Sequence, residues 1–391
     1  MKEWRLKDCC TSISDGDHLA PPKASTGIPF ITISNIDASN HIDFSDTLFV
    51  PYDYYDKLDN VRKAQTNDII YSVVGSFGKP VLIKDNKPFV FQRHIAILRP
   101  NKEIVDSRYL YYIMLSRDFF MQADTVAIGA AQRTISLTAL RNMKVNLPDL
   151  PTQKRIATIL SRYDSLIENY QKQIKLLEEA AQRLYKEWFV DLRFPGYEKV
   201  KVVDGVPEGW ERKKLGEIAD VLMGQSPKSE FYNTDKQGLP FHQGVGSYGI
   251  RFVNDDVYSS SLTRVAEPNS VLFSVRAPVG RLNITKNRVV IGRGLAAMNH
   301  KGGCQSYLFY LLKERFFKDN IIGNGSIFAS ITKDELLNQT FVVPDLRLIE
   351  KFNVIAKNFD SKLVNCDNQS QLLTESRDRM LVKLMSGEIE V

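Results

Sequence analysis

Residues 148–189 read PDLPTQKRIATILSRYDSLIENYQKQIKLLEEAAQRLYKEWF, and this stretch combines a helix-start signal with a long apolar stripe. Asp149 and Thr152 suit a helix start because their side chains accept hydrogen bonds from free backbone N–H groups. Alternate spacing by four and three residues, which is typical of a coiled coil, then joins Ile156, Leu160, Tyr163, Ile167, Tyr170, Ile174, Leu177, Ala181, Leu184 and Trp188. The stretch therefore predicts one long helix that buries its stripe against a partner.

The same signals return 196 residues later, where Pro344-Asp345-Leu346 matches Pro148-Asp149-Leu150. The second stripe is weakened by the polar residues Ser370 and Arg377, and it consists of Phe352, Ala356, Phe359, Leu363, Cys366, Leu373, Met380 and Leu384. A helix of about 40 residues is about 60 Å long, which is more than a domain of ~145 residues needs. We expect the two helices to pair antiparallel, with the domains at opposite ends. The alternative is that each helix packs only on its own domain.

The segments before the two helices also match each other. Each opens on a tryptophan followed by basic residues and leucine, at Trp4 and at Trp210. Both then carry β-branched and aromatic runs that are typical of strands. The matching ranges are 27–30 with 238–241, 67–83 with 269–285, 89–96 with 289–296, and 129–136 with 325–332. The chain therefore contains an internal duplication.

These observations predict an α+β fold in which two similar β-rich domains are separated by two long helices paired as an antiparallel coiled coil. The first domain is expected at residues 1–147 and the first, central helix at 148–193. A linker and the second domain follow at 194–343, and the second, C-terminal helix at 344–391.

Composition sets the class of protein but not its partner. The chain has 391 residues, of which 43% are hydrophobic and 25% charged, as in ordinary globular proteins. Its net charge of +6 favours an anionic partner without identifying it. No apolar run approaches the ~18 residues that span a membrane, so we expect a cytoplasmic protein. Four cysteines without metal-binding spacing are interpreted as reduced thiols, namely Cys9, Cys10, Cys304 and Cys366.

The sequence contains only weak candidates for catalytic motifs. Residues 75–80 have the wrong spacing for a phosphate-binding loop, and residues 244–249 carry Gly-x-Gly-x-x-Gly but lead into a predicted strand instead of a helix. The five histidines are scattered, and the acidic runs at 53–59 and 255–256 lack the remaining residues of a nuclease motif. We therefore predict no catalytic residue and no metal site in this chain.

The chain resembles the specificity subunit of type I restriction-modification systems. The resemblance covers nearly the whole chain and is most specific at residues 184–191 (LYKEWFVD), at Phe194-Pro195-Gly196 and at residues 377–389 (RDRMLVKLMSGEI). It implies two target recognition domains that each read one half of a bipartite double-stranded DNA sequence. It also implies helices that set the spacing and dock two methyltransferase subunits.

The same resemblance implies that methylation and cleavage are carried out by partner subunits, including restriction and translocase subunits. S-adenosylmethionine, ATP and Mg are then expected only in those partners, and no cofactor in this chain. Two other hypotheses remain. One is a coiled-coil adaptor whose β-rich domains bind protein instead of DNA, and the other is a self-contained nuclease or methyltransferase with an unrecognised site.

Base and phosphate contacts need side chains that donate hydrogen bonds, so polar loop residues are the candidates for DNA binding. Matched positions such as Arg93 and Arg293 can instead maintain the shared fold, which makes the unmatched pairs Gln132-Arg133 and His242-Gln243 better candidates for specificity. The full candidate set is Lys23, Ser34, Asn35, Arg93, Gln132, Arg133, Lys228, His242, Gln243, Ser274, Arg276, Arg293 and Ser326.

Overall fold

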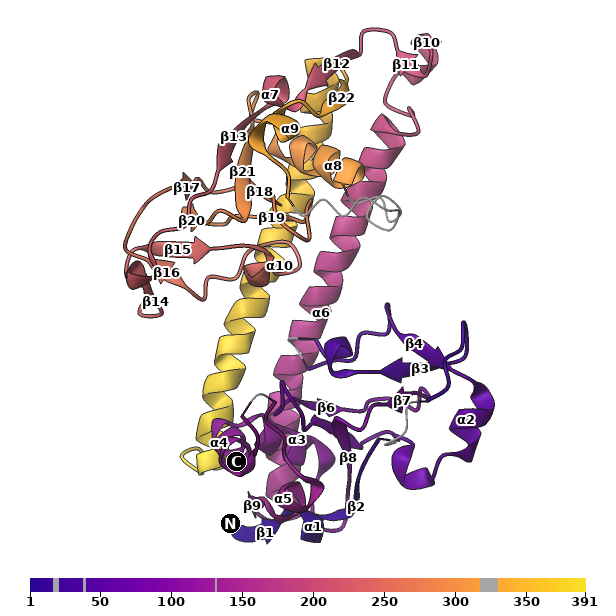
Figure 1. Ribbon diagram of the computed structural model, residues 1–391, viewed down its shortest axis with the longest axis vertical. Helices are drawn as coiled ribbons and strands as arrows, with labels where there is room; N and C mark the ends of the chain where they lie inside the picture. The colour runs from indigo at the N-terminus through magenta and orange to yellow at the C-terminus, as the bar shows by residue number, and fades with distance from the viewer. Residues whose placement is uncertain (17–20, 38–39, 131, 317–329) are drawn as a thin grey trace. The chain divides into compact units, whose positions relative to one another are not determined.

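A computed structural model describes residues 1–16, 21–37, 40–130, 132–316 and 330–391. Two compact units are present, and each contains one β-rich region together with parts of both long helices (Figure 1). The first unit consists of residues 1–166 and 373–391, and the second of residues 167–372. The candidate residue Ser326 lies outside the described residues.

The two long helices predicted from the stripes are present. Helix α6 runs over Leu150–Phe189 and helix α10 over Leu346–Ser386. Asp149 accepts a hydrogen bond from the backbone N–H of Thr152 at 3.3 Å, and Asp345 accepts one from Leu348 at 3.1 Å. These side chains occupy free donors of the first turn, which is why both helices begin directly after Pro-Asp.

In the first unit the main sheet is antiparallel with the order β2-β8-β5-β6. A smaller sheet has the order β4-β3-β7, and β1 pairs with β9. The strands are β1 Lys2–Arg5, β2 Cys10–Asp15, β3 Ile28–Ile31, β4 Leu48–Val50, β5 Ile69–Ser72, β6 Pro80–Leu82, β7 Val90–Phe91, β8 Ile95–Pro100 and β9 Lys144–Leu147. The short helices are α1 Leu6–Cys9, α2 Tyr52–Lys57, α3 Ser107–Leu115, α4 Arg117–Val126 and α5 Leu137–Asn142.

The second unit repeats this topology. Its main sheet has the order β13-β21-β18-β19, its smaller sheet the order β14-β16-β15-β20-β17, and β12 pairs with β22. The strands of these sheets are β12 Glu211–Lys214, β13 Ala219–Met223, β14 Tyr232–Asn233, β15 Leu239–His242, β16 Tyr258–Ser259, β17 Val265–Ala266, β18 Val271–Ser274, β19 Leu282–Ile284, β20 Val289–Ile291, β21 Leu295–His300 and β22 Thr340–Val343. A hairpin of β10 Val202–Val203 and β11 Val206–Pro207 precedes them, and the short helices are α7 Leu215–Ile218, α8 Gln305–Phe316 and α9 Lys333–Leu337.

The duplication inferred from sequence is therefore also a duplication of strand order. Strands β2, β8, β5 and β6 correspond in order and pairing to β13, β21, β18 and β19. In both units the smaller sheet contains a parallel pair, β3 with β7 and β15 with β20. All residues of β5 and β18 are buried, and the first three residues of each strand are hydrophobic.

The long helices run antiparallel within each unit. In the second unit, the Cys366 thiol donates to the Gln173 side chain at 3.8 Å, while the Trp188 and Phe352 ring centroids lie 5.9 Å apart. Residues with higher numbers on α6 therefore contact residues with lower numbers on α10. In the first unit, Arg377 Nη1 donates to Asp164 Oδ1 at 2.8 Å, which follows the same direction.

The predicted stripe residues face the interior. Those in the core of the second unit are Tyr170, Ile174, Leu177, Leu184, Trp188, Phe352, Phe359 and Leu363. Those in the core of the first unit are Ile156, Leu160, Met380 and Leu384. Tyr163, Ile167 and Leu373 are buried or half-buried. These side chains join the two helices and anchor the β-rich region of each unit to them.

Candidate nucleic-acid interface

The parallel strand pair of each unit brings two chain segments together at one edge. In β3 and β7, Ile31 lies opposite Phe91, and in β15 and β20, His242 lies opposite Ile291. Since the carboxyl ends of parallel strands meet at the same edge, the residues that follow them become neighbours. Arg93 comes two residues after β7 and Arg293 two residues after β20, and both side chains are exposed.

A third segment joins the same edge in both units. The Val73 N–H donates to the His94 carbonyl at 2.9 Å, which places the end of β5 beside Arg93. Val74 in turn pairs with Thr134, so Gln132 also lies at this edge. A Cβ atom on Gly75 would lie 3.6 Å from the Gln132 Nε2 atom. We call the exposed residues Ser34, Arg93 and Gln132 the first edge.

The second unit repeats these connections with different side chains. The Val275 N–H donates to the Gly294 carbonyl at 2.9 Å, and Arg276 pairs with Ser330. The structure therefore brings together the exposed residues Gln243, Arg276 and Arg293, which we call the second edge. Val74 occupies the position of Arg276 in the first unit, since each follows the same strand and pairs with the same returning segment.

Four sequence candidates have side chains engaged within the fold. Asn35 caps its own turn by accepting from the Thr32 N–H at 2.9 Å. Arg133 forms an ion pair with Asp124. Ser274 is buried, donates to the Pro278 carbonyl at 2.6 Å and accepts from the Arg281 N–H at 2.8 Å.

The fourth of these candidates is His242, whose ring is buried. Its Nδ1 atom lies 2.9 Å from the Ser247 hydroxyl, and its Nε2 atom lies 3.2 Å from an Asp255 carboxylate oxygen. In each of the pairs Gln132-Arg133 and His242-Gln243, one side chain is therefore exposed and the other is engaged within the fold. Gln132 and Gln243 are exposed, whereas Arg133 and His242 hold the loops in place.

Two lysine candidates lie outside the edges as defined. Lys23 is exposed beside Ala24, which pairs with Phe49 of β4. Lys228 is exposed and its ammonium group lies 3.8 Å from the Glu230 carboxylate. Both are suited to contact phosphates and less suited to read base edges.

Ser226 and Gly224, which lies two residues before it, were not among the residues predicted from the sequence. The Ser226 hydroxyl donates to the Gln243 Oε1 atom at 2.8 Å and accepts from the Arg293 N–H at 3.2 Å. A Cβ atom on Gly224 would lie 2.1 Å from the Gly292 carbonyl oxygen, so only glycine lets the chain pass there. Gly16 repeats this close approach in the first unit, at 2.2 Å from the Phe91 carbonyl oxygen. A glycine directly after each of β2 and β13 is the sequence feature that could have pointed to this close approach of the chain.

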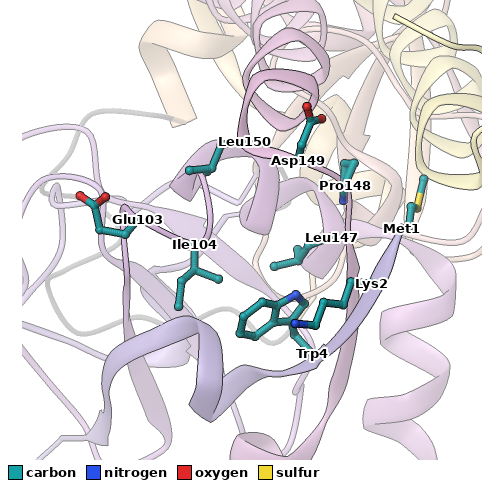
Figure 2. A pocket seen from close by; sticks show the side chains of 9 residues that line it. All are labelled: Met1, Lys2, Trp4, Glu103, Ile104, Leu147, Pro148, Asp149 and Leu150. Carbon is teal, nitrogen blue, oxygen red and sulfur yellow. The ribbon is translucent and has the colours of Figure 1, made fainter.

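A separate hollow of about 570 Å³ opens beside the start of α6 (Figure 2). It is lined by β1 and β9 and by residues 103–104 and 147–150. The Lys2 ammonium group lies 4.5 Å from the centre of the Trp4 ring in this hollow. It contains none of the predicted DNA-binding residues, so we keep it separate from the two edges.

Two features are absent from the part of the chain that the structure describes. Among those residues, no group of three or more His, Cys, Asp or Glu side chains is arranged to hold a metal ion. Within the same ranges, no helix combines the length and apolar character needed to cross a bilayer.

Comparison with known proteins identifies the class. Residues 1–179 and 207–369 match the family described as "Type I restriction modification DNA specificity domain". The chain belongs to this family, and the resemblance inferred from its sequence is confirmed. Membership implies a specificity role and not a catalytic one, and it disfavours the adaptor hypothesis.

Individual relatives agree with this assignment. A putative type I restriction enzyme MjaX specificity subunit of Methanocaldococcus jannaschii is 30% identical, over 100% of this chain and 94% of the relative. The HindI specificity subunit of Haemophilus influenzae is 22% identical, over 84% of this chain and 88% of the relative. The crystal structure of a type I restriction-modification S subunit from M. genitalium has the same fold. Its TM-score is 0.54 at 18% identity, covering 98% of this chain and 95% of that one.

Proposed function

We propose that this chain is the DNA-specificity subunit of a type I restriction-modification complex, in which the first and second edges each read one half of a bipartite target. The observation that carries this proposal is a repeated backbone with different side chains at corresponding positions. Both units use the same strand pairing, yet the second edge has Arg276 where the first unit has Val74. A shared scaffold with different donors suits two readers of different sequences.

The chemistry of the edges supports base readout. An arginine guanidinium group can donate two hydrogen bonds to O6 and N7 of guanine, and a glutamine side chain can bind N6 and N7 of adenine. Arg93 and Gln132 offer these groups on the first edge, and Arg276, Arg293 and Gln243 offer them on the second. Each well-formed pair of this kind discriminates against the wrong base by about 1–3 kcal/mol.

The partners and the catalytic steps form the second part of the proposal. Two methyltransferase subunits dock on the helical region. Methylation and cleavage are carried out by these subunits and by the restriction and translocase subunits. S-adenosylmethionine, ATP and Mg bind to these partner subunits. The apolar stripes of α6 and α10 are buried, so docking uses other side chains. Exposed Leu166 and Leu176 on α6, and Leu372 and Val382 on α10, are suitable for this purpose. The predicted domains, residues 1–147 and 194–343, are proposed as the two target recognition domains.

Selection from a random duplex pool tests the readout. The full complex of this chain with its methyltransferase partners is expected to recover two short fixed blocks separated by a constant gap. In the Arg276→Met variant one block should lose a preferred base while the other block stays unchanged. Arg288→Met is the matched control, because this exposed arginine pairs with Glu267 away from the second edge. An unselected pool from an intact complex would refute sequence recognition.

A further inference from the structure

A buried arginine connects the second recognition domain to both long helices. Arg251 is 2% exposed, and its Nη1 atom lies 2.5 Å from the Glu178 Oε1 atom on α6. Its Nη2 atom donates to the Asp360 Oδ1 atom on α10 at 2.9 Å. The guanidinium carbon also lies 3.6 Å from the centre of the Phe309 ring on α8. One side chain thus contacts three helices of its unit.

The two carboxylates are balanced by further donors from α8. The Lys313 ammonium group donates to the Glu178 Oε2 atom at 2.9 Å, and the Ser306 hydroxyl donates to the Asp360 Oδ2 atom at 2.5 Å. We call Arg251, Glu178, Asp360, Ser306 and Lys313 the clamp. Two anionic and two cationic groups offset each other in it, which is the arrangement that a buried ion pair requires.

Arg251 keeps its charge inside the clamp. Burial by itself lowers the pKa of the guanidinium group, but Glu178, Tyr310 and Asp360 outweigh burial and raise that pKa above its ordinary value. Arg251 therefore stays protonated where it is buried between the two carboxylates.

The clamp is close in sequence to the second edge. Residues 243–251 run from the edge residue Gln243 directly to Arg251. At the start of this segment, buried His242 contacts the Ser247 hydroxyl at 2.9 Å. At its end, the Arg251 carbonyl accepts from the Ile284 N–H of β19 at 3.0 Å. The segment is therefore fixed to the recognition domain at both ends and to the helix pair through one side chain.

The internal repeat places a matching carboxylate in the first unit, where the described residues give it a different arginine partner. Asp164 on α6 corresponds to Asp360 on α10, at the same separation of 196 residues as the Pro-Asp-Leu motifs. Asp164 also accepts from a hydroxyl of its own domain, Tyr112 on α3, at 2.5 Å, and from an arginine. That arginine is Arg377 of α10, at 2.8 Å, whereas its counterpart in the second unit comes from a recognition loop.

We propose that Arg251 is a positioning residue that fixes the second edge relative to the long helices and so sets the gap between the two halves of the DNA target. This inference rests on the proposed function. Adding one base pair to the gap turns a half-site by about 34–36° around the duplex axis, because the duplex repeats every 10–10.5 base pairs. A rigidly held edge cannot follow that rotation, whereas an edge freed from the helices can.

The test uses duplexes in which both selected half-sites are kept and only the gap is varied. The complex with the wild-type chain is expected to bind one gap at least about a hundredfold more tightly than its neighbours, since losing base contacts at a half-site costs about 1–3 kcal/mol per base pair. The Arg251→Met complex should bind gaps one base pair longer and shorter within about tenfold of the best gap. Its preferred bases in each half-site should stay the same. Arg288→Met is the control and should keep the wild-type gap preference.

Two milder variants keep the test decisive. Glu178→Gln and Asp360→Asn preserve shape and remove one charge each, so they replace Arg251→Met if that chain fails to assemble. A gap preference as sharp as that of the wild type, or an equal loss of affinity at every gap, would overturn the proposal, because the second result is general destabilisation. Absence of sequence selection by the wild-type complex is a different result, and it would refute the proposed function itself.

Discussion

Phe352 joins the second recognition domain to the long helices by apolar packing. Its side chain is fully buried on α10, and its ring lies 5.1 Å from that of Phe189 and 5.8 Å from that of Tyr185, both on α6. The rings of Tyr307 and Tyr310 on α8 each lie 6.4 Å away. One ring therefore joins α6, α10 and the recognition domain.

Phe352→Ala is expected to destabilise the second unit by about 3–5 kcal/mol, because a Phe→Ala change in a core removes transfer free energy and leaves a cavity. At 1.4 kcal/mol per factor of ten, backbone amides that exchange by unfolding of this unit should lose protection by roughly two to three and a half orders of magnitude. Hydrogen exchange measured by mass spectrometry separates peptides of residues 181–189 and 304–316 from peptides of the first unit.

Val354→Ala is the matched control, since Val354 lies two residues further along the same helix and is 66% exposed. It should change protection by less than about tenfold, because surface substitutions usually stay within about 0.5 kcal/mol. A cost below about 1 kcal/mol for Phe352→Ala, or an equal loss of protection in both units, would show that the Phe352 ring does not hold the second unit together.

Three further predictions concern charge and pH. Lys228→Ala should weaken binding to all DNA sequences alike, because an exposed lysine contacts phosphate. Titration at several salt concentrations should show that the slope of log affinity against log salt falls by about 1 in magnitude. A change in base preference would contradict this role. Burial lowers the pKa of His300 below 6.5, and its Nδ1 atom accepts from the Gly302 N–H at 2.9 Å, so the folded protein binds fewer protons than the unfolded chain. Stability of the second unit should therefore fall as pH drops below about 6.5, and denaturant midpoints of His300→Asn should fall less over that range. Arg377→Met should cost the first unit about 1–3 kcal/mol in chemical denaturation, because Asp164 loses its charged donor; an unchanged midpoint would show that solvent replaces it.

The sequence by itself determined the helices and the duplication. Periodicity and capping are local properties, so the stripe from Ile156 to Trp188 and the Asp149 cap predict α6 without any tertiary information. The separation of 196 residues between the Pro-Asp-Leu motifs gave the second helix in the same way. Strand order followed less directly, because matching segments show that two domains share a topology but do not show which strands pair.

Only the tertiary structure decided which polar side chains are free to meet a ligand. Gln243 and His242 are neighbours in sequence, yet one is exposed and the other buried, because His242 is the last residue of β15 and Gln243 lies just beyond the strand. The second edge joins Gln243, Arg276 and Arg293 through strand pairings over long sequence separations, which no local pattern encodes. In the sequence, Arg251 is a single charged residue after a glycine-rich loop, and nothing nearby in the sequence indicates that it is buried. Its burial between Glu178 and Asp360 depends on two helices far away in the chain, and long-range packing alone brings those charges together.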